Sequence, residues 1–293
     1  MENLGAWITN GTAAPFYVRK TFTLSKPIQR ATAKVCGLGQ FILHANGAKV
    51  GDHELDPGWT DYRKLIQYVT FDLTALLHEG ANAIGAEVGN GWFIKNNEHY
   101  TFSLPPFMPL NPNPYQPFGD ALVFAMELTL EYTNGSRERL YADDTFRTAK
   151  HPVIQSNVYG SETIDHALLQ SGWDRADFDD SAWTPARIAA APTGVLAEQS
   201  QPPIKVIRTY PAQRLSDANG REIYDFGQNM SGILSLSLKG KKGDVVRIYP
   251  AEKLGPEGDV DQVAKGWVTV DSVITCILGQ DDVWSGFPMA HWP

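Results

Sequence analysis

Apolar and polar side chains alternate with a period of two along much of this chain, and the alternation restricts the fold more than any other feature. Successive side chains of a β-strand point to opposite faces, so this pattern is typical of strands with one buried face. Helical signals are few: Asp72–His78 fits about one helical turn, and Ser181–Ala190 is at best weakly helical. The sequence therefore predicts an all-β protein.

Turn residues between alternating segments predict three hairpins. Asn46-Gly47 is the strongest signal, because both central residues of a type I′ turn need positive φ. Thr133–Ser136 carries another Asn-Gly pair, and the loop Lys239–Gly243 is long enough for a bulged hairpin. The predicted hairpins pair residues 41–45 with 48–50, 128–132 with 137–141, and 233–238 with 244–249.

Two stretches rich in turn and linker residues divide the chain. Residues 191–203 have linker composition, and we place the domain boundary after residue 196. This predicts two antiparallel, jelly-roll-like β-sandwich domains, 1–196 and 197–293, the second truncated. Between Phe102 and Gly119, prolines exclude a central strand because they lack the amide donor, so we expect a long surface loop. Its Phe107 and Tyr115 either face a sugar or pack on the loop's own sandwich.

Charge and apolar runs exclude some classes of partner. The formal net charge of -8 disfavours nucleic acid, whose phosphates need cation-rich surfaces. Met1–Ala6 lacks the basic and apolar regions of a signal peptide, and no stretch approaches the ~18 apolar residues of a membrane span. We therefore expect a cytoplasmic protein with no membrane partner. Cys36 and Cys276 stand in strand-like contexts and are expected to be buried free thiols.

A series of sequence blocks resembles one family, the N-terminal modules of bacterial α-L-rhamnosidases. The match follows the family's order along nearly the whole chain. Single blocks of this kind are weak signals, but a spaced series is hard to obtain by chance. The blocks are 37–39 with 46–47, 50–62 ending in Gly58-Trp59-Thr60-Asp61-Tyr62, Gly89-Asn90-Gly91-Trp92, 160–165, 172–183, 224–232 and 251–252.

This resemblance implies carbohydrate handling without catalysis by this chain. In the family the front modules are jelly-roll-like sandwiches, some of which bind L-rhamnose through a calcium ion, and a following (α/α) barrel hydrolyses the substrate. After Leu278-Gly279-Gln280 the family would continue toward that barrel, whereas this chain stops at Pro293. We therefore expect the catalytic barrel to be absent.

No catalytic residue is assigned from the sequence. Inverting glycosidases need two carboxyl groups roughly 6.5–9.5 Å apart, and the family's pair belongs to the barrel. The many acidic residues of the chain are expected to bond to turns and strand ends, as Asp side chains commonly do. No GxSxG elbow or Cys-His partnership indicates a nucleophile either.

Candidate sugar-binding residues come from the resemblance and from general sugar chemistry. Sugars are recognised by aromatic faces together with amides and carboxylates, and Gly89-Asn90-Gly91-Trp92 offers both an aromatic ring and an amide. We predict Asn46, Asn90 and Trp92 as carbohydrate-binding residues and Asn90 as a calcium ligand. The alternatives are a turn role for Asn46 and a core role for Trp92. Trp59, Trp173 and Trp183 are assigned to packing.

The sequence leaves three functions open. The first is an accessory carbohydrate-binding or scaffold portion of an α-L-rhamnosidase, with L-rhamnose or rhamnosides as partner. The second is a glycosidase whose site lies within the sandwiches. The third is a structural module that docks on a partner chain or self-associates through an open sheet edge.

Overall fold

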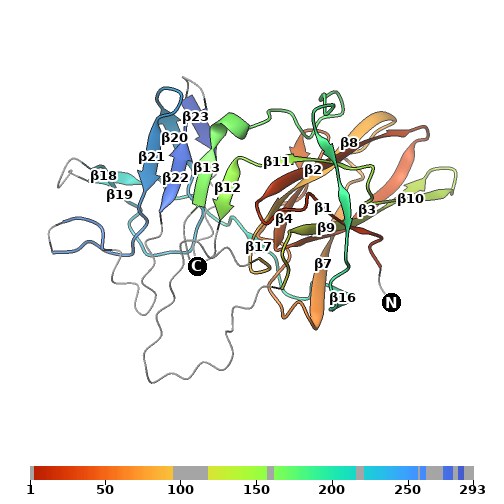
Figure 1. The fold of residues 1–293 in the computed structure, drawn as a ribbon, viewed down its shortest axis with the longest axis horizontal. Helices are drawn as coiled ribbons and strands as arrows, with labels where there is room; N and C mark the ends of the chain where they lie inside the picture. The colour runs from red at the N-terminus through yellow and green to blue at the C-terminus, as the bar shows by residue number, and fades with distance from the viewer. Residues whose placement is uncertain are drawn as a thin grey trace. The chain divides into compact units, whose positions relative to one another are not determined.

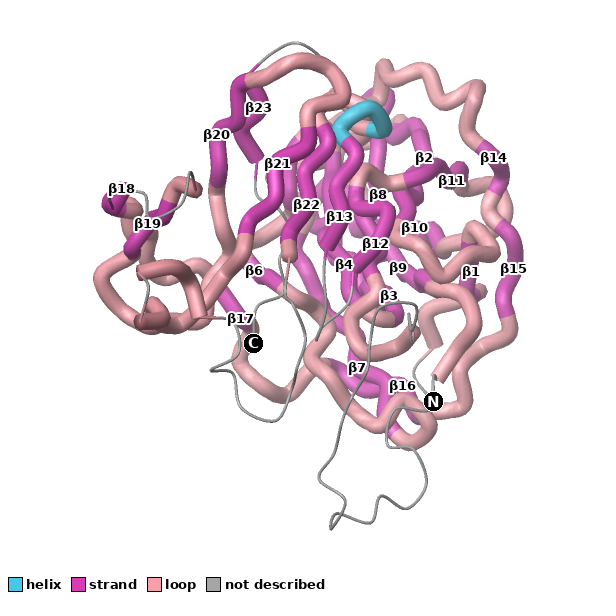
Figure 2. Tube along the Cα trace, turned by 60° about the vertical axis from the view of Figure 1, so that its left-hand side comes forward, coloured by secondary structure: helices cyan, strands magenta, loops and turns pink. Residues whose placement is uncertain are grey.

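The described part of the protein is built almost entirely from β-strands, which confirms the all-β prediction. The structure is a computed structural model that describes residues 3–94, 118–156, 162–215, 221–256, 258–261, 273–279 and 283–286. Within these ranges, the one helical segment is the 3₁₀ turn η1, His166–Leu168, drawn in cyan in Figure 2. No helix in them is long and apolar enough to cross a membrane. The loop expected between Phe102 and Gly119, with Phe107 and Tyr115, lies largely outside the described residues.

The chain forms two compact units whose segments interleave in sequence. Unit 1 comprises residues 1–94, 117–151 and 170–205, and unit 2 comprises residues 95–116, 152–169 and 206–293. This division differs from a single boundary after residue 196. Residues 152–169 leave the first block because their strands pair with a strand near residue 275, and residues 197–205 stay with unit 1 because they pair with its strands.

Unit 1 is a sandwich of two sheets, seen as two layers in Figure 1. The seven-stranded sheet has the order β15-β1-β9-β3-β7-β16, with β10 paired to β9, and the six-stranded sheet has the order β14-β11-β2-β8-β4-β5. Pairing is antiparallel except between β16 and β7, which run parallel. Two short strands, β17 and β6, pair separately. The strands of unit 1 are β1 Trp7–Thr9, β2 Phe16–Leu24, β3 Ile28–Leu38, β4 Gln40–Ala45, β5 Ala48–Lys49, β6 His53–Glu54, β7 Leu65–Asp72, β8 Gly80–Gly89, β9 Val123–Tyr132, β10 Arg137–Tyr141, β11 Arg147–Lys150, β14 Thr184–Pro185, β15 Arg187–Ala189, β16 Val195–Glu198 and β17 Ile204–Lys205.

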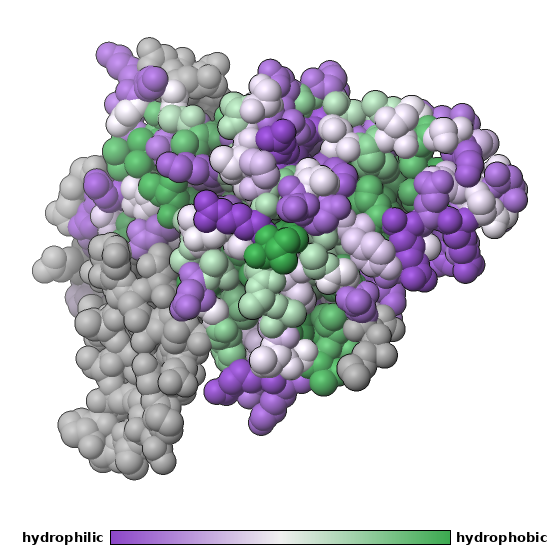
Figure 3. Space-filling model, turned by 45° about the vertical axis from the view of Figure 1, so that its right-hand side comes forward, coloured by the Kyte–Doolittle hydropathy of each residue, from purple (hydrophilic) through white to green (hydrophobic). Residues whose placement is uncertain are grey.

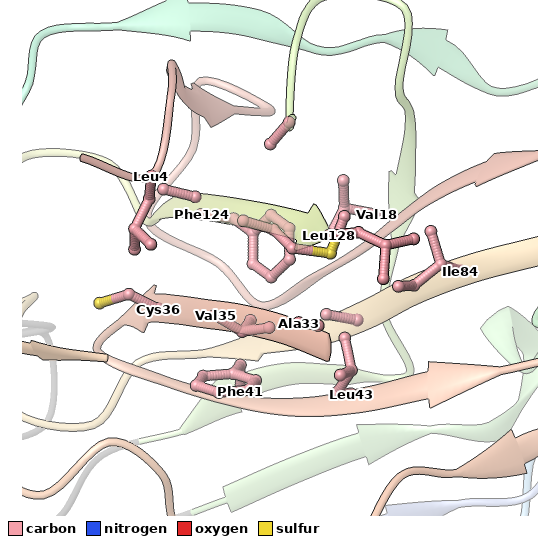
Figure 4. Close-up of a cluster of buried hydrophobic side chains, with 14 of the residues drawn as sticks. Leu4, Val18, Ala33, Val35, Cys36, Phe41, Leu43, Ile84, Phe124 and Leu128 are labelled. Atoms are coloured by element: carbon pink, nitrogen blue, oxygen red, sulfur yellow. The ribbon is translucent and has the colours of Figure 1, made fainter. Parts of the chain in front are cut away.

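The hydrophobic core of unit 1 lies between its two sheets. In Figure 4, Val35 and Phe124 from one sheet point toward the layer that carries Val18, Ile84 and Leu43 of the other. All five side chains are at most 2% exposed. Each such side chain contributes about 1.5–3 kcal/mol when it leaves water, so the alternating pattern drives the sheets together.

Two of the three predicted hairpins are confirmed, and both lie in unit 1. Strands β4 and β5 pair across Asn46 and Gly47, whose φ values of 49° and 86° are those that a type I′ turn needs. Strands β9 and β10 pair from Glu131 and Arg137 onward. At Asp72–His78 the amides of Leu76 and Leu77 both donate to the Leu73 carbonyl, which gives the expected single turn.

Unit 2 has a four-stranded sheet with the order β12-β13-β22-β21, in which β13 and β22 are parallel. Its core is small: Val153, Ile164, Ile274 and Cys276. Two further pairs, β18 with β19 and β20 with β23, are separate. The strands of unit 2 are β12 Val153–Ser156, β13 Glu162–Asp165, β18 Gln213–Leu215, β19 Ile223–Asp225, β20 Leu236–Lys239, β21 Val245–Ile248, β22 Ile274–Ile277 and β23 Val283–Gly286.

One local prediction is wrong. The third hairpin does not form, because β21 pairs with β22 and β20 pairs with β23; strands that are neighbours in sequence thus find more distant partners. Residues 181–190 are not helical but contain β14 and β15, which pair with β11 and β1. The cysteine prediction is confirmed: Cys36 and Cys276 are buried and free, and burial raises the pKa of the Cys276 thiol to about 11.

Candidate functional site

Two tryptophans from different loops of unit 1 lie side by side. The ring centroids of Trp59 and Trp92 are 5.5 Å apart, at an interplanar angle of 38°. Trp92 is partly buried against the core, whereas Trp59 is 61% exposed. The packing role expected for Trp59 is therefore wrong, because this loop residue rests on another ring at the surface and not within the core. Trp173 and Trp183 are 6% and 5% exposed, as a packing role requires.

The loop that carries Trp59 is held by a network of side-chain amides. Gln199 Oε1 accepts a hydrogen bond from the Gly58 amide at 2.8 Å, and Gln67 Nε2 donates to the Gly58 carbonyl at 3.3 Å. Gln199 Nε2 also donates to Asp56, whose other carboxylate oxygen lies 2.7 Å from His53 Nδ1. Because both polar groups of Gly58 are fixed, the backbone next to Trp59 is held in one position.

Asn90 is buried beneath the loop that carries Trp92. Its side chain is 2% exposed, and its Nδ2 donates to the Ala13 carbonyl at 2.7 Å. Its backbone carbonyl lies so close to Gly39 that a Cβ on residue 39 would be 1.9 Å from it. The Asn90 Oδ1 and the nearby Gln40 Oε1 are buried acceptors that receive no hydrogen bond from the described residues.

The described residues do not fit a calcium ion at Asn90. Calcium takes six to eight oxygen ligands, usually with several carboxylates among them. Asn90 and Gln40 supply neutral amide oxygens, and the buried carboxylate of Asp56 is already bonded to His53 and Gln199. Across the described ranges no group of three His, Cys, Asp or Glu side chains is arranged to hold a metal.

The structure does not bring Asn46 to the tryptophan pair. Asn46 Nδ2 donates to the Leu76 carbonyl and to Asn82 Oδ1, each at 2.8 Å, and its Oδ1 accepts from the Ala83 amide at 2.8 Å. Asn46 bonds to Ala83 within β8, whereas Asn90 follows the last residue of that strand, so about 23 Å of strand separates them. Asn46 therefore has the positive φ of its turn, and its side chain bonds to residues 76–83 of the same unit.

A charged cluster covers the outer face of the six-stranded sheet. His44 on β4 lies 2.9 Å from Asp174 through Nδ1 and 3.1 Å from Glu87 through Nε2. The other oxygen of Glu87 lies 2.6 Å from His151 Nε2. The rings of Tyr17, Trp173 and Trp183 pack together beside the cluster, and Gly85 leaves room for Trp173. Residues 170–183 are thereby held against the sheet.

The electrostatics of this cluster do not suit glycoside hydrolysis. Burial lowers the pKa of His44, but hydrogen bonds to Asp174 and Glu87 outweigh burial and raise it to about 9. Burial raises the pKa of Glu87, yet its bonds to His151 and His44 hold it far below the usual range, and the pKa of Asp174 is lowered by His44 against burial. Both carboxylates are therefore ionised at neutral pH, and neither can serve as the proton donor that the reaction needs.

One protonated acid does occur, in unit 2. Burial raises the pKa of Glu162 to about 8. The residue is 4% exposed on β13, in the same sheet as Ile164 and Cys276, so a glycoside cannot reach its carboxyl group. Neither Glu162 nor the two carboxylates beside His44 therefore supply an accessible acid and base pair.

Sequence reasoning missed the exposed Trp59 and the charged cluster. The signal for Trp59 was present, because Pro57-Gly58-Trp59 is a loop pattern like Gly89-Asn90-Gly91-Trp92. No local signal exists for the cluster, since His44 and Asp174 are 130 residues apart in sequence.

Two family models match most of the chain. Residues 26–208 match the α-L-rhamnosidase N-terminal domain, and residues 216–282 match the bacterial α-L-rhamnosidase concanavalin-like domain. An α-L-rhamnosidase of Streptomyces avermitilis is 33% identical over 87% of this chain and 24% of its own length. One of Formosa agariphila is 31% identical over 84% of this chain and 25% of its own length. The chain thus spans about a quarter of these relatives.

Solved structures give the same picture. The crystal structure of Streptomyces avermitilis α-L-rhamnosidase complexed with L-rhamnose has a TM-score of 0.82 and 31% identity, covering 94% of this chain and 26% of that one. The α-L-rhamnosidase from Dictyoglumus thermophilum has a TM-score of 0.82 and 27% identity, covering 97% of this chain and 32% of that one.

Proposed function

The chain belongs to the bacterial α-L-rhamnosidase family, and from this premise we propose that it binds carbohydrate, without hydrolysing it, at the Trp59–Trp92 pair of unit 1. It corresponds to the β-sandwich N-terminal portion of these enzymes. The sugar class that we propose is L-rhamnose or a rhamnoside. The exposed tryptophan pair is the observation that carries the proposal.

The physical case rests on the shape and polarity of the pair. An aromatic face covers the C–H surface of a sugar ring, and large exposed rings on a rigid base bind at low entropic cost. Trp59 is exposed, its loop is held at both polar groups of Gly58, and its neighbour Trp92 is anchored in the core. Tryptophan is highly buried on average, because burial of its large ring is favourable, so the exposure of Trp59 makes it a candidate for contact with a ligand.

Calcium is not required by this proposal. Asn90 supports the loop of Trp92 from beneath through its bond to Ala13, and is not proposed as a metal ligand. We expect L-rhamnose to bind equally well in calcium and in a chelator.

Calorimetry with L-rhamnose and a methyl rhamnoside tests the proposal. Trp59→Ala should weaken binding at least tenfold, about 1.4 kcal/mol, because it removes the exposed ring face. Tyr224→Ala is the matched control, since it removes an exposed aromatic ring, 49% accessible, from unit 2. Binding that Trp59→Ala leaves unchanged, or no binding of either sugar, would contradict the proposal.

A second candidate role is docking through open sheet edges. Strands β15 and β16 stand at the two edges of the seven-stranded sheet, and Ile188 and Val195 on them are 58% and 66% exposed. In Figure 3 hydrophobic residues lie scattered among hydrophilic ones over the face in view. Edge strands with apolar side chains favour pairing with another chain. Sedimentation that gives a monomer at all concentrations would contradict self-association.

A further inference from the structure

A pocket lies in unit 1, next to the loops that carry the tryptophan pair. Its volume is about 350 Å³. Its lining includes three aromatic residues: the ring of Tyr62 meets those of Phe93 and Phe118 edge to face, with centroids 5.5 and 5.0 Å apart, and Tyr62 and Phe93 are 2% and 4% exposed. Its rim is formed by Arg63, Asp120 and residues 189–193. Pockets of this size and apolar lining are typical of small-molecule sites.

The pocket and the tryptophan pair are built by the same two loops. Trp59 and Tyr62 come from one loop, and the consecutive residues Trp92 and Phe93 come from the other. Each loop therefore places one ring in the exposed pair and one in the lining of the pocket. Trp92 and Phe93 are neighbours in the chain, with Cα atoms about 3.8 Å apart, so the same loop backbone carries a residue of each site.

The charges at the rim favour a neutral ligand. Arg63 donates to Asp61 through Nε at 2.8 Å and through Nη2 at 3.1 Å, and its guanidinium lies 5.3 Å from the centre of the Phe118 ring. An anionic ligand would have to compete with this bidentate carboxylate. Asp120 and Thr193 are exposed at the rim and offer hydrogen bonds to hydroxyl groups. A partly apolar lining with polar groups at its rim suits a small neutral ring that carries several hydroxyl groups.

We propose that this pocket is a second carbohydrate subsite, separate from the Trp59–Trp92 pair, which takes a neutral pyranose residue. The proposal rests on the proposed function in so far as unit 1 handles carbohydrate. The two sites use different rings, so their occupancy can be followed separately.

Amide NMR on the full chain tests the proposal. L-rhamnose, D-glucose and a rhamnosyl-glucose disaccharide are titrated, while the amides of Gly119 and Thr193 report on the pocket and the indole N–H signals of Trp59 and Trp92 report on the pair. Saturable shifts at the pocket amides are expected with at least one of these sugars, and they should persist in Trp59→Ala. Ala191→Phe, which fills the pocket from an exposed rim position, should weaken them at least tenfold; Ala75→Phe, at an exposed turn, is the matched control.

The outcomes separate the two proposals. Indole shifts without pocket shifts would overturn the second subsite and leave the proposed function standing. Pocket shifts without indole shifts would support the subsite and count against the tryptophan pair. Pocket shifts that Ala191→Phe leaves unchanged would also overturn the subsite. Asp120→Asn gives a milder variant, expected to weaken the pocket shifts about threefold while the fold is retained.

Discussion

Replacement of His44 by Asn should destabilise unit 1 in a strongly pH-dependent way. His44 is the cation between Asp174 and Glu87, whose side chains are only 12% and 19% exposed. Without it, two buried carboxylates lose their shared partner. Removing one member of a buried ion pair typically costs 3–5 kcal/mol. The rise of the His44 pKa from 6.5 to about 9 corresponds to about 3 kcal/mol, which is of the same size.

The pH dependence follows from the direction of that shift. A histidine whose pKa is higher in the folded state adds stability that is fully present below 6.5 and is lost as the pH rises through about 9. Burial opposes the rise, and the bonds to Asp174 and Glu87 cause it. The two carboxylates that face His44 have lowered pKa values in the folded protein. They therefore add stability above about pH 4, and this stability is lost only in stronger acid.

Urea unfolding at a series of pH values, followed by tryptophan fluorescence, measures this effect. The difference between wild type and His44→Asn should be about 3 kcal/mol near pH 6 and shrink toward zero above pH 9. His78→Asn, at an exposed histidine, should change the free energy of unfolding by less than about 0.5 kcal/mol. A difference that does not vary between pH 5 and 10, or an NMR titration that places the His44 pKa at or below 6.5, would refute the reasoning.

Two further predictions concern backbone packing and a buried acid. Gly39→Ala should destabilise unit 1 by about 3 kcal/mol or more, because its Cβ would lie 1.9 Å from the Asn90 carbonyl oxygen. Gly232→Ala, where a Cβ meets nothing within 4 Å, should stay within about 0.5 kcal/mol in the same denaturation assay. Glu162→Gln should raise the stability of unit 2 at pH 7 by at least ~1 kcal/mol, because burial raises the carboxyl pKa from 4.5 to about 8 and ionisation therefore opposes folding. The gain should grow between pH 4.5 and 8; thermal unfolding curves that coincide for the two proteins at pH 5 and pH 8 would count against it.

Local patterns in the sequence determined the class of fold and its tightest turns. Alternation of period two requires one buried face per strand, so two layers of sheet follow from it directly. The Asn46-Gly47 turn was predictable because few residues adopt positive φ, and the burial of Cys36 and Cys276 follows from their apolar strands. The family resemblance likewise depended on short ordered blocks that survive in the sequence itself.

Partners distant in the chain were decided only by the tertiary structure. A strand's pattern states which face is buried but not which strand lies beside it, so the pairing of β20 with β23 and the parallel pairing of β13 with β22 were not predictable. The same holds for His44 and Asp174, which meet across 130 residues, and for Trp59, whose exposure depends on what its loop meets in space. Periodicity predicts which side chains of one strand are buried. Contacts between segments that are distant in sequence depend on how all the strands pack together in the core, which no single segment determines.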